Sequence, residues 1–225
     1  MSRFSRRREI VIALSSAPLL AAGAVRAQAP SAPEAGVDYT VLPNPQPTDS
    51  PAKVEVLDFF WYGCPHCYAF LPELEAWRKK LPADVDFRHV AVDFGDPGRE
   101  AHTKIYYSLQ VLGRVDDMHV KVFDAFHLKH LRLNDRDAIA DFMAANGIAR
   151  DKWLSTFDSF SVAGLVKRAR ITSQNYTIDG TPTIAIDGRY LTSPSIEHTH
   201  TFAGTLGAMS FLVDHARQEH AHRKS

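Results

Sequence analysis

The chain has 225 residues, of which 45% are hydrophobic and two are cysteines, with 26 basic side chains against 26 acidic ones. This length suits one domain, or one domain with an inserted subdomain, and it can bury a sizeable core. The composition excludes collagen, low-complexity disorder and a disulfide-dense mini-protein, and the formal charge of zero argues against an electrostatically driven nucleic-acid binder.

The first 27 residues have the pattern of a secretory signal peptide. Arginines precede an apolar run over residues 10–24, and small residues follow at positions −3 and −1 of a cleavage site after Ala27. The run is shorter than the about 20 apolar residues that span a bilayer, which makes a retained membrane anchor the weaker alternative. We therefore expect export and cleavage after Ala27. Residues 5–8 leave twin-arginine export open beside the Sec route, although Glu9 fits it poorly.

Removal of this segment changes the charge of the protein. It takes away five arginines and one glutamate, so the mature chain has 21 basic and 25 acidic residues, while all 11 histidines and both cysteines stay. No other stretch approaches membrane-spanning length. The sequence therefore predicts a mildly acidic, soluble product in a compartment where disulfides persist.

The elements of an α/β protein follow in chain order. Residues 28–51 are rich in proline and are interpreted as an extended N-terminal segment, with a short strand at 39–42. The compact β-branched run at 54–60 predicts a strand buried on both faces, helical spacing marks 67–80, and 85–94 is a second strand. A strand, a helix and a strand in this order predict a parallel pair with a crossover.

The second half begins with a helical block at 97–170. Apolar residues recur there at helical intervals, which predicts four or five short helices and no strand. The helices are expected to be separated by Gly113, Asn134 and Gly147, which serve as stops or caps. Asp187-Gly188 then predicts a two-residue hairpin turn between strands at 183–186 and 189–192, and a last helix is expected at 199–218. The expected division of the chain is a signal peptide at 1–27, an N-terminal segment at 28–51, an α/β domain at 52–96 and 171–220, a helical insertion at 97–170 and a tail at 221–225.

Both cysteines lie where the first buried strand meets the helix that follows it. Cys64 is expected at or near the helix N-cap, where unpaired N–H groups and the positive end of the helix dipole favour a thiolate. Pro65 suits the first helical turn, and His66 adds positive charge and a donor beside the same sulfur. A stabilised thiolate stabilises the dithiol form, which makes a Cys64–Cys67 disulfide oxidising. The sequence therefore predicts a redox-active pair.

Two other interpretations of the cysteines are less favoured. A cystine that serves only stability would close too short a loop to constrain the unfolded chain much. A zinc site would need further cysteines or paired histidines, and an exported metal-binding protein that uses Cys64, Cys67 and C-terminal histidines is kept as an alternative of another class. These histidines, which otherwise form a solvated tail, are His198, His200, His215, His220 and His222.

Three features together resemble the DsbA family of periplasmic thiol:disulfide oxidoreductases, which have a thioredoxin fold. Residues 56–68 are similar to its active-site segment and contain its Cys-Pro-His-Cys tetrad. The helical block lies where that family has an inserted helical domain, and residues 180–183 resemble its cis-proline loop. The resemblance covers about residues 38–216. It implies an α/β, thioredoxin-like fold with an inserted helical subdomain, a periplasmic location and no cofactor.

The resemblance also implies roles for residues of the site. Cys64 would be the exposed sulfur that forms a mixed disulfide with a substrate, and Cys67 would be its more buried ring partner. Pro182 would be cis, and Thr181 would offer backbone groups to an extended substrate. Asp58, an acid in an apolar strand, would lie beneath the disulfide and take part in proton transfer at the buried cysteine. The alternative is that it faces a sheet edge or pairs with a lysine.

The expectations for neighbouring residues are less specific. Glu55, near the start of the same strand, is expected to be exposed. Three aromatic residues near the tetrad fit either an apolar platform for unfolded chains or plain core, and these are Trp61, Tyr62 and Tyr68. Three basic residues on one predicted helix are expected to form a solvated face, and these are Lys167, Arg168 and Arg170.

The sequence therefore predicts a monomeric enzyme, a dithiol oxidase that donates the Cys64–Cys67 disulfide to newly exported proteins. The resemblance implies unfolded, cysteine-containing proteins as substrates and a DsbB-like membrane quinone reductase for reoxidation, with no nucleic acid as partner. An isomerase or reductase of the same fold stays an alternative, because Thr181 is shared with isomerases at that loop, although the N-terminal segment is too short for a dimerisation domain. A chaperone or binding module that does not use the cysteines is a further alternative.

Overall fold

The computed structural model of the chain describes residues 32–196 and 201–224. The expected signal peptide with its cleavage site lies outside these residues, as do His198 and His200. Within the described residues, no helix is long and apolar enough to cross a membrane.

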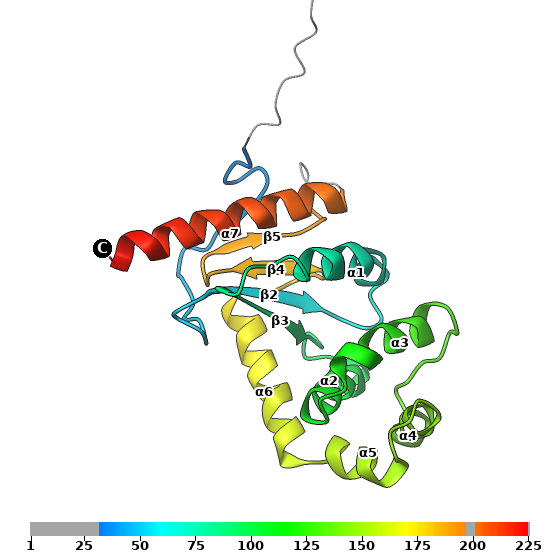
Figure 1. Cartoon of the computed structure of the whole chain (residues 1–225). Coiled ribbons are helices and arrows are strands. Elements are labelled where there is room, and N and C mark those ends of the chain that lie inside the picture. Colours follow the sequence, from blue (N-terminus) through cyan, green and yellow to red (C-terminus); the bar gives the residue numbers. More distant parts are fainter. Residues whose placement is uncertain (1–31, 197–200, 225) are drawn as a thin grey trace, which may run out of the picture. The chain divides into compact units, whose positions relative to one another are not determined.

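A five-stranded mixed sheet forms the centre of the fold (Figure 1). Its strands are β1 (Thr40–Val41), β2 (Val54–Phe60), β3 (Val85–Ala91), β4 (Thr183–Ile186) and β5 (Tyr190–Thr192). The spatial order is β1-β5-β4-β2-β3, in which β2 and β3 are parallel and every other pair is antiparallel. The predicted parallel pair and the predicted hairpin are thus both confirmed.

Seven helices occur in the described part of the chain. They are α1 (Pro65–Arg78), α2 (Pro97–Val111), α3 (Val115–His127), α4 (Arg136–Ala145), α5 (Arg150–Phe157), α6 (Phe160–Asn175) and α7 (Phe202–Lys224). Helices α1 and α7 lie on one side of the sheet, whereas α2 and α6 lie beside β3 on the other (Figure 1). The α/β class and the run of short helices between the two halves of the sheet agree with the sequence pattern.

Strand β2 separates two clusters of apolar side chains. All seven of its residues are buried. Because neighbouring side chains along a strand point to opposite faces, Val56 packs with α1 and α7, while Leu57 and Phe59 pack with the helical block. Asp58 shares the face of Val56, and the parallel register with β3 places it opposite His89. The one acid near the middle of this strand therefore lies under α1.

The N-terminal segment docks along the hairpin. The N–H of Leu42 donates to the Arg189 carbonyl over 2.7 Å, and the N–H of Gln46 donates to the Gly188 carbonyl, also over 2.7 Å. Gly188 has φ +67°, and a Cβ at this position would lie 2.1 Å from the Gln46 carbonyl oxygen. Only glycine fits here, because both the turn conformation and the close approach of Gln46 exclude a side chain.

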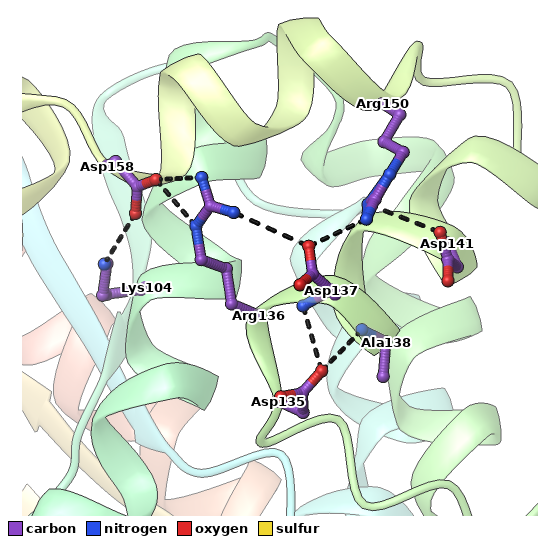
Figure 2. A network of polar contacts seen from close by, with 8 residues as sticks. All are labelled: Lys104, Asp135, Arg136, Asp137, Ala138, Asp141, Arg150 and Asp158. Carbon is purple, nitrogen blue, oxygen red and sulfur yellow. Dashed lines mark hydrogen bonds and ion pairs between the residues drawn. The ribbon is translucent and has the colours of Figure 1, made fainter.

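Helix boundaries in the helical block follow local capping chemistry. Gly113 and Gly147 end α2 and α4 with φ of +66° and +83°, as their sequence positions predict. The carboxylate of Asp135 accepts the N–H groups of Asp137 and Ala138 and starts α4. Charged side chains then link α2, α4 and α5 on the outside of the block (Figure 2). In this network Arg136 donates two hydrogen bonds, over 2.8 and 2.6 Å, to one carboxylate oxygen of Asp158.

Several expectations are wrong in detail. Strand β3 ends at Ala91, and α7 continues to Lys224, past its predicted end at residue 218. Glu55 is 2% exposed, not exposed as expected, because it forms an ion pair with Arg88 and accepts the N–H of Asp49 over 2.9 Å.

The predicted basic face on α6 is only partly solvated. Lys167 and Arg168 are exposed as expected. Arg170 instead donates to Asp93, whose side chain is fully buried, and to Glu100. An arginine that pairs with a buried carboxylate joins α6 to the segment after β3, and sequence spacing alone does not reveal such a partner.

Candidate active site

The tetrad begins where β2 ends and α1 starts. Cys64 is the N-cap of α1, with extended backbone angles, and its sulfur accepts the N–H of Cys67 over 3.3 Å. Pro65 occupies the first turn, where its missing N–H leaves no bond unmade. The sulfur of Cys64 therefore lies at the positive end of the helix, as the sequence predicts.

A second segment lies against the same sulfur. The Cys64 thiol donates to the carbonyl of Thr181 over 3.3 Å, and the Thr181–Pro182 bond is cis. Both thiols are free in this structure. The expected exposure of Cys64 is wrong, since Cys64 is 6% and Cys67 5% exposed. The physical reason is the proximity of the cis-proline loop, which covers the Cys64 sulfur.

The two thiols differ strongly in acidity. The hydrogen bond from the Cys67 thiol is the main cause that lowers the pKa of Cys64 to about 5. Burial opposes this shift, while Thr181 and the N–H groups of Cys67 and His66 add to it. Burial raises the pKa of Cys67, and the hydrogen bond to Cys64 and the charge of Asp58 raise it further. Cys64 thus ionises first and donates to Thr181 only while it carries its proton, whereas the buried Cys67 thiol stays protonated.

His66 acts on the sulfur through its backbone in this geometry. The backbone N–H of His66 is among the groups that lower the pKa of Cys64. The residue itself is exposed to solvent.

Asp58 lies in a buried polar cluster beneath α1. It is 3% exposed, and its Oδ2 lies 2.7 Å from Nδ1 of His89. Nε2 of His89 in turn lies 3.2 Å from Oε1 of Glu75 on α1. The alternative for Asp58, a sheet edge or a lysine partner, is therefore wrong: its partner is a histidine. Because the charge of Asp58 raises the pKa of Cys67, the cluster is electrostatically linked to the catalytic pair.

The three aromatic residues around the tetrad were expected to form either an apolar platform for unfolded chains or plain core, and they differ in their burial. Tyr62 is core, at 1% exposure, with its hydroxyl 2.9 Å from Nδ1 of His119. Trp61 is half-buried and donates its indole N–H to His102 over 2.8 Å. Tyr68 is also half-buried, and it stacks on His127 with ring centroids 4.7 Å apart. Two of the three therefore reach the surface near Cys64.

Trp61 also explains the glycine before Cys64. A Cβ on Gly63 would lie 2.4 Å from the Trp61 ring, so any side chain would displace the indole. The same two residues line a surface cavity of about 390 Å³ together with residues of α2 and of the segment after α3. A recess of mixed polar and apolar lining thus lies directly beside the tetrad.

Sequence reasoning missed the partners of Asp58. His89 and Glu75 lie on elements that were predicted, β3 and α1, but neither residue was singled out. The available signal was the parallel pairing of the two strands, since an acid in an apolar strand needs a buried partner, and the neighbouring strand is the nearest source of one.

The C-terminal histidines that fall in the described part belong to α7. His220 is bonded to Asp187 over 2.8 Å and its side chain is 13% exposed, so the expected solvated tail is wrong for this residue. His215 is more exposed and stacks on Phe211. Among residues 32–196 and 201–224, no three His, Cys, Asp or Glu side chains are grouped so that they could hold a metal ion.

Comparison with known proteins supports the redox interpretation. The profile of the DSBA-like thioredoxin domain matches residues 55–207. The thiol:disulfide interchange protein DsbA of Burkholderia cepacia is 42% identical over 195 residues, which cover 86% of this chain and 90% of the relative. DsbA of Bordetella parapertussis is 41% identical over 204 residues, or 89% of this chain and 96% of the relative.

A solved structure agrees with these relatives. The crystal structure of Pseudomonas aeruginosa DsbA superposes with a TM-score of 0.77 at 36% identity and covers 84% of this chain and 96% of that one. These matches favour the oxidase over the isomerase, metal-binding and chaperone alternatives. The chain therefore belongs to the DsbA-like family of thioredoxin-fold thiol:disulfide oxidoreductases.

Proposed function

We propose that Cys64 is the sulfur that exchanges disulfides with substrate proteins and that Cys67 is its partner in the catalytic ring. The observation that carries this assignment is the position of Cys64 at the N-cap of α1, where hydrogen bonds lower the pKa of its thiol to about 5. A dithiol form stabilised in this way makes the corresponding disulfide a strong oxidant.

The reaction follows from the difference in acidity between the two thiols. A substrate thiolate attacks the Cys64 sulfur, a mixed disulfide forms, and the electron pair of the broken Cys64–Cys67 bond leaves on Cys67. The second substrate thiol then attacks the substrate sulfur of the mixed disulfide and releases Cys64 as a thiolate. The substrate loses two electrons and two protons, Cys67 takes up one proton, and the other goes to solvent. The low pKa of Cys64 makes it the better leaving group in the second step.

The cis-proline loop is the proposed contact for the substrate chain. The Thr181 carbonyl already accepts a hydrogen bond from Cys64, so an extended substrate that pairs with Thr181 would bring its own cysteine to the same sulfur. Backbone hydrogen bonds of this kind do not depend on the side chains of the substrate. We therefore propose that the substrates are unfolded or newly exported proteins that contain cysteines.

The remaining proposals concern the cellular setting. Residues 1–27 would direct export and be removed after Ala27, so that the mature protein acts in the periplasm as a monomer. A DsbB-like membrane quinone reductase would reoxidise it. Residues 97–170 would form a helical insertion in the domain made by 52–96 and 171–220, whereas the expected tail at 221–225 is wrong for residues 221–224, which belong to α7.

A dithiol-oxidation assay tests this function. The oxidised mature protein is mixed with a reduced peptide that contains two cysteines, and disulfide formation in the peptide is followed by mass spectrometry. We expect one peptide disulfide per protein, no reaction with Cys64→Ser, and a trapped mixed disulfide when Cys67→Ser protein is activated at Cys64. A redox equilibrium with glutathione that proved strongly reducing would refute the oxidase assignment. The mass of the exported protein tests the cleavage site directly.

A further inference from the structure

A line of hydrogen-bonded side chains leads from beneath the catalytic pair to the protein surface. Asp58 is bonded to His89 over 2.7 Å, His89 to Glu75 over 3.2 Å, and Glu75 to Arg78 over 2.8 Å. The exposed fraction of these side chains rises along the line from 4% to 6%, 19% and 33%. The line therefore has one end in the core and the other in water.

At the buried end of the line, one carboxylate oxygen of Asp58 is not used by a hydrogen bond among the described residues. Oδ2 of Asp58 is used by His89, whereas Oδ1 is buried and has no hydrogen-bond partner among the described residues. An unpaired buried carboxylate oxygen is costly, which makes such an atom a site signal. The same carboxylate raises the pKa of Cys67 through its charge.

Among the described residues, His89 is the one side chain that bonds to both carboxylates, those of Asp58 and Glu75. Each ring nitrogen faces a carboxylate, and because ionised carboxylates only accept hydrogen bonds, both nitrogens donate and the ring is charged. Burial opposes this charge, but the bonds to Asp58 and Glu75 prevail and raise the pKa of His89 above its ordinary value of 6.5.

Groups on the other elements around His89 leave this charge in place. The ring of His119 on α3 lies 4.7 Å away, and burial and the charge of His89 lower its pKa, so it stays neutral. On α2, Tyr106 lies 6.3 Å away and is uncharged, because burial raises its pKa beyond the neutral range. Arg78 on α1 reaches the line only through Glu75.

We propose that His89 and Glu75 form a proton route between the surface and Asp58, and that His89 is the positioning residue that lets Asp58 exchange a proton with Cys67. This proposal rests on the proposed function of the Cys64–Cys67 pair. When Cys67 leaves as a thiolate, the charged ring of His89 gives its Nδ1 proton to Asp58, and the carboxyl group of Asp58 then passes one proton to the Cys67 sulfur. His89 is reprotonated from solvent by way of Glu75. No electrons pass along the route, and each turnover moves one proton inward; reoxidation moves one outward.

The test compares three variants of the mature protein in a single-turnover reaction. The oxidised protein reacts with a reduced two-cysteine peptide from about pH 5 to about pH 9, a range that brackets histidine titration. His89→Gln keeps a hydrogen-bond donor but carries no exchangeable charge, and Glu75→Gln keeps the outer acceptor without its charge. His220→Gln is the matched control, because His220 is bonded to a buried carboxylate, that of Asp187, at the α7 end of the hairpin.

We expect His89→Gln to slow the reaction at least about tenfold near pH 7, which is less than the about 10²–10⁴-fold of a positioned proton donor because water partly replaces the lost group. We expect an inflection above pH 6.5 in the pH profile of the wild-type protein and its loss in His89→Gln. Glu75→Gln should shift that inflection to lower pH, since the carboxylate no longer supports the charge on His89. His220→Gln should keep the wild-type rate and profile.

Wild-type rates and pH profiles in both His89→Gln and Glu75→Gln would overturn the proposal. A lower melting temperature of His89→Gln with an unchanged profile would overturn it too, because that result assigns His89 a structural role only. If His89→Gln does not fold, the profile of Glu75→Gln, whose side chain is partly exposed, decides. Failure of wild-type protein to oxidise the peptide would instead refute the proposed function itself.

Discussion

The sulfur of Cys64 lies 3.3 Å from the carbonyl oxygen of Thr181, a residue 117 positions later in the chain. This contact joins the N-terminus of α1 to the cis-proline loop, and it covers the reactive thiol in the dithiol form. This hydrogen bond belongs to the dithiol form, because the Cys64 sulfur of the disulfide form carries no hydrogen to donate.

The acidity of Cys64 depends first on the Cys67 thiol. The thiolate absorbance of the reduced protein should titrate with a midpoint near 5. Cys67→Ala removes the main donor and should raise the midpoint, whereas Cys67→Ser retains a hydroxyl donor and should raise it less. A wild-type midpoint close to that of an ordinary thiol, about 8.5, would contradict the hydrogen-bonded geometry of the pair.

Asp58 should make Cys67 harder to ionise. Its charge raises the pKa of the Cys67 thiol, so Asp58→Asn should lower that pKa. The measurement is the pH dependence of Cys67 alkylation in a Cys64→Ser background, with Asp158→Asn as a control on the surface network. If the alkylation midpoint is the same with and without Asp58→Asn, the carboxylate is not coupled to Cys67.

His89 should make folding stability depend on pH above neutrality. Its folded pKa is raised above 6.5, so its contribution is complete below pH 6.5 and is lost as the pH rises through the folded pKa. The pKa values of His102 and His119 are lowered mainly by burial, and their effects fall below pH 6.5, outside this window.

Urea unfolding of a Cys64→Ser/Cys67→Ser background, which removes thiol titration, should show this decline. The decline should be absent when His89→Gln is added. An equal decline with and without His89 would mean that other groups cause it.

Two arginine–aspartate pairs with similar geometry should differ in their effect on stability. Arg170 lies 2.7 Å from Asp93, whose side chain is fully buried, whereas Arg136 lies 2.6 Å from Asp158, which is 44% exposed (Figure 2). Loss of Arg170 leaves a buried carboxylate with one cation fewer. We expect Arg170→Met to cost about 2 kcal/mol, less than for a fully buried pair because Arg170 itself is partly exposed.

In thermal unfolding this cost corresponds to a fall in Tm of about 4–8 °C. Arg136→Met should give a shift too small to resolve, because water screens its pair. Equal shifts in the two variants would show that burial of the acid does not set the energy of these pairs.

Local sequence patterns determined most of the elements of this fold. The compact apolar run of β2, the helical spacing of α1 and the Asp187-Gly188 turn each encode their structure within a few residues. The position of the tetrad could also be predicted locally, because the N-cap and the positive end of the helix dipole follow from where a helix starts. For this reason the redox chemistry of Cys64 could be predicted before any contact was known.

The surroundings of the tetrad were decided only by the tertiary structure. Exposure of Cys64 depends on a loop more than a hundred residues away, and the partner of Asp58 depends on the register between β2 and β3. Glu55 and Arg170 show the same limit, since each pairs with a charge on another element. The burial of a side chain and its charge partners both depend on neighbours that come from distant parts of the chain. The sequence by itself therefore predicted which sulfur would react, whereas the fold decided what covers that sulfur and which side chains lie beneath its partner.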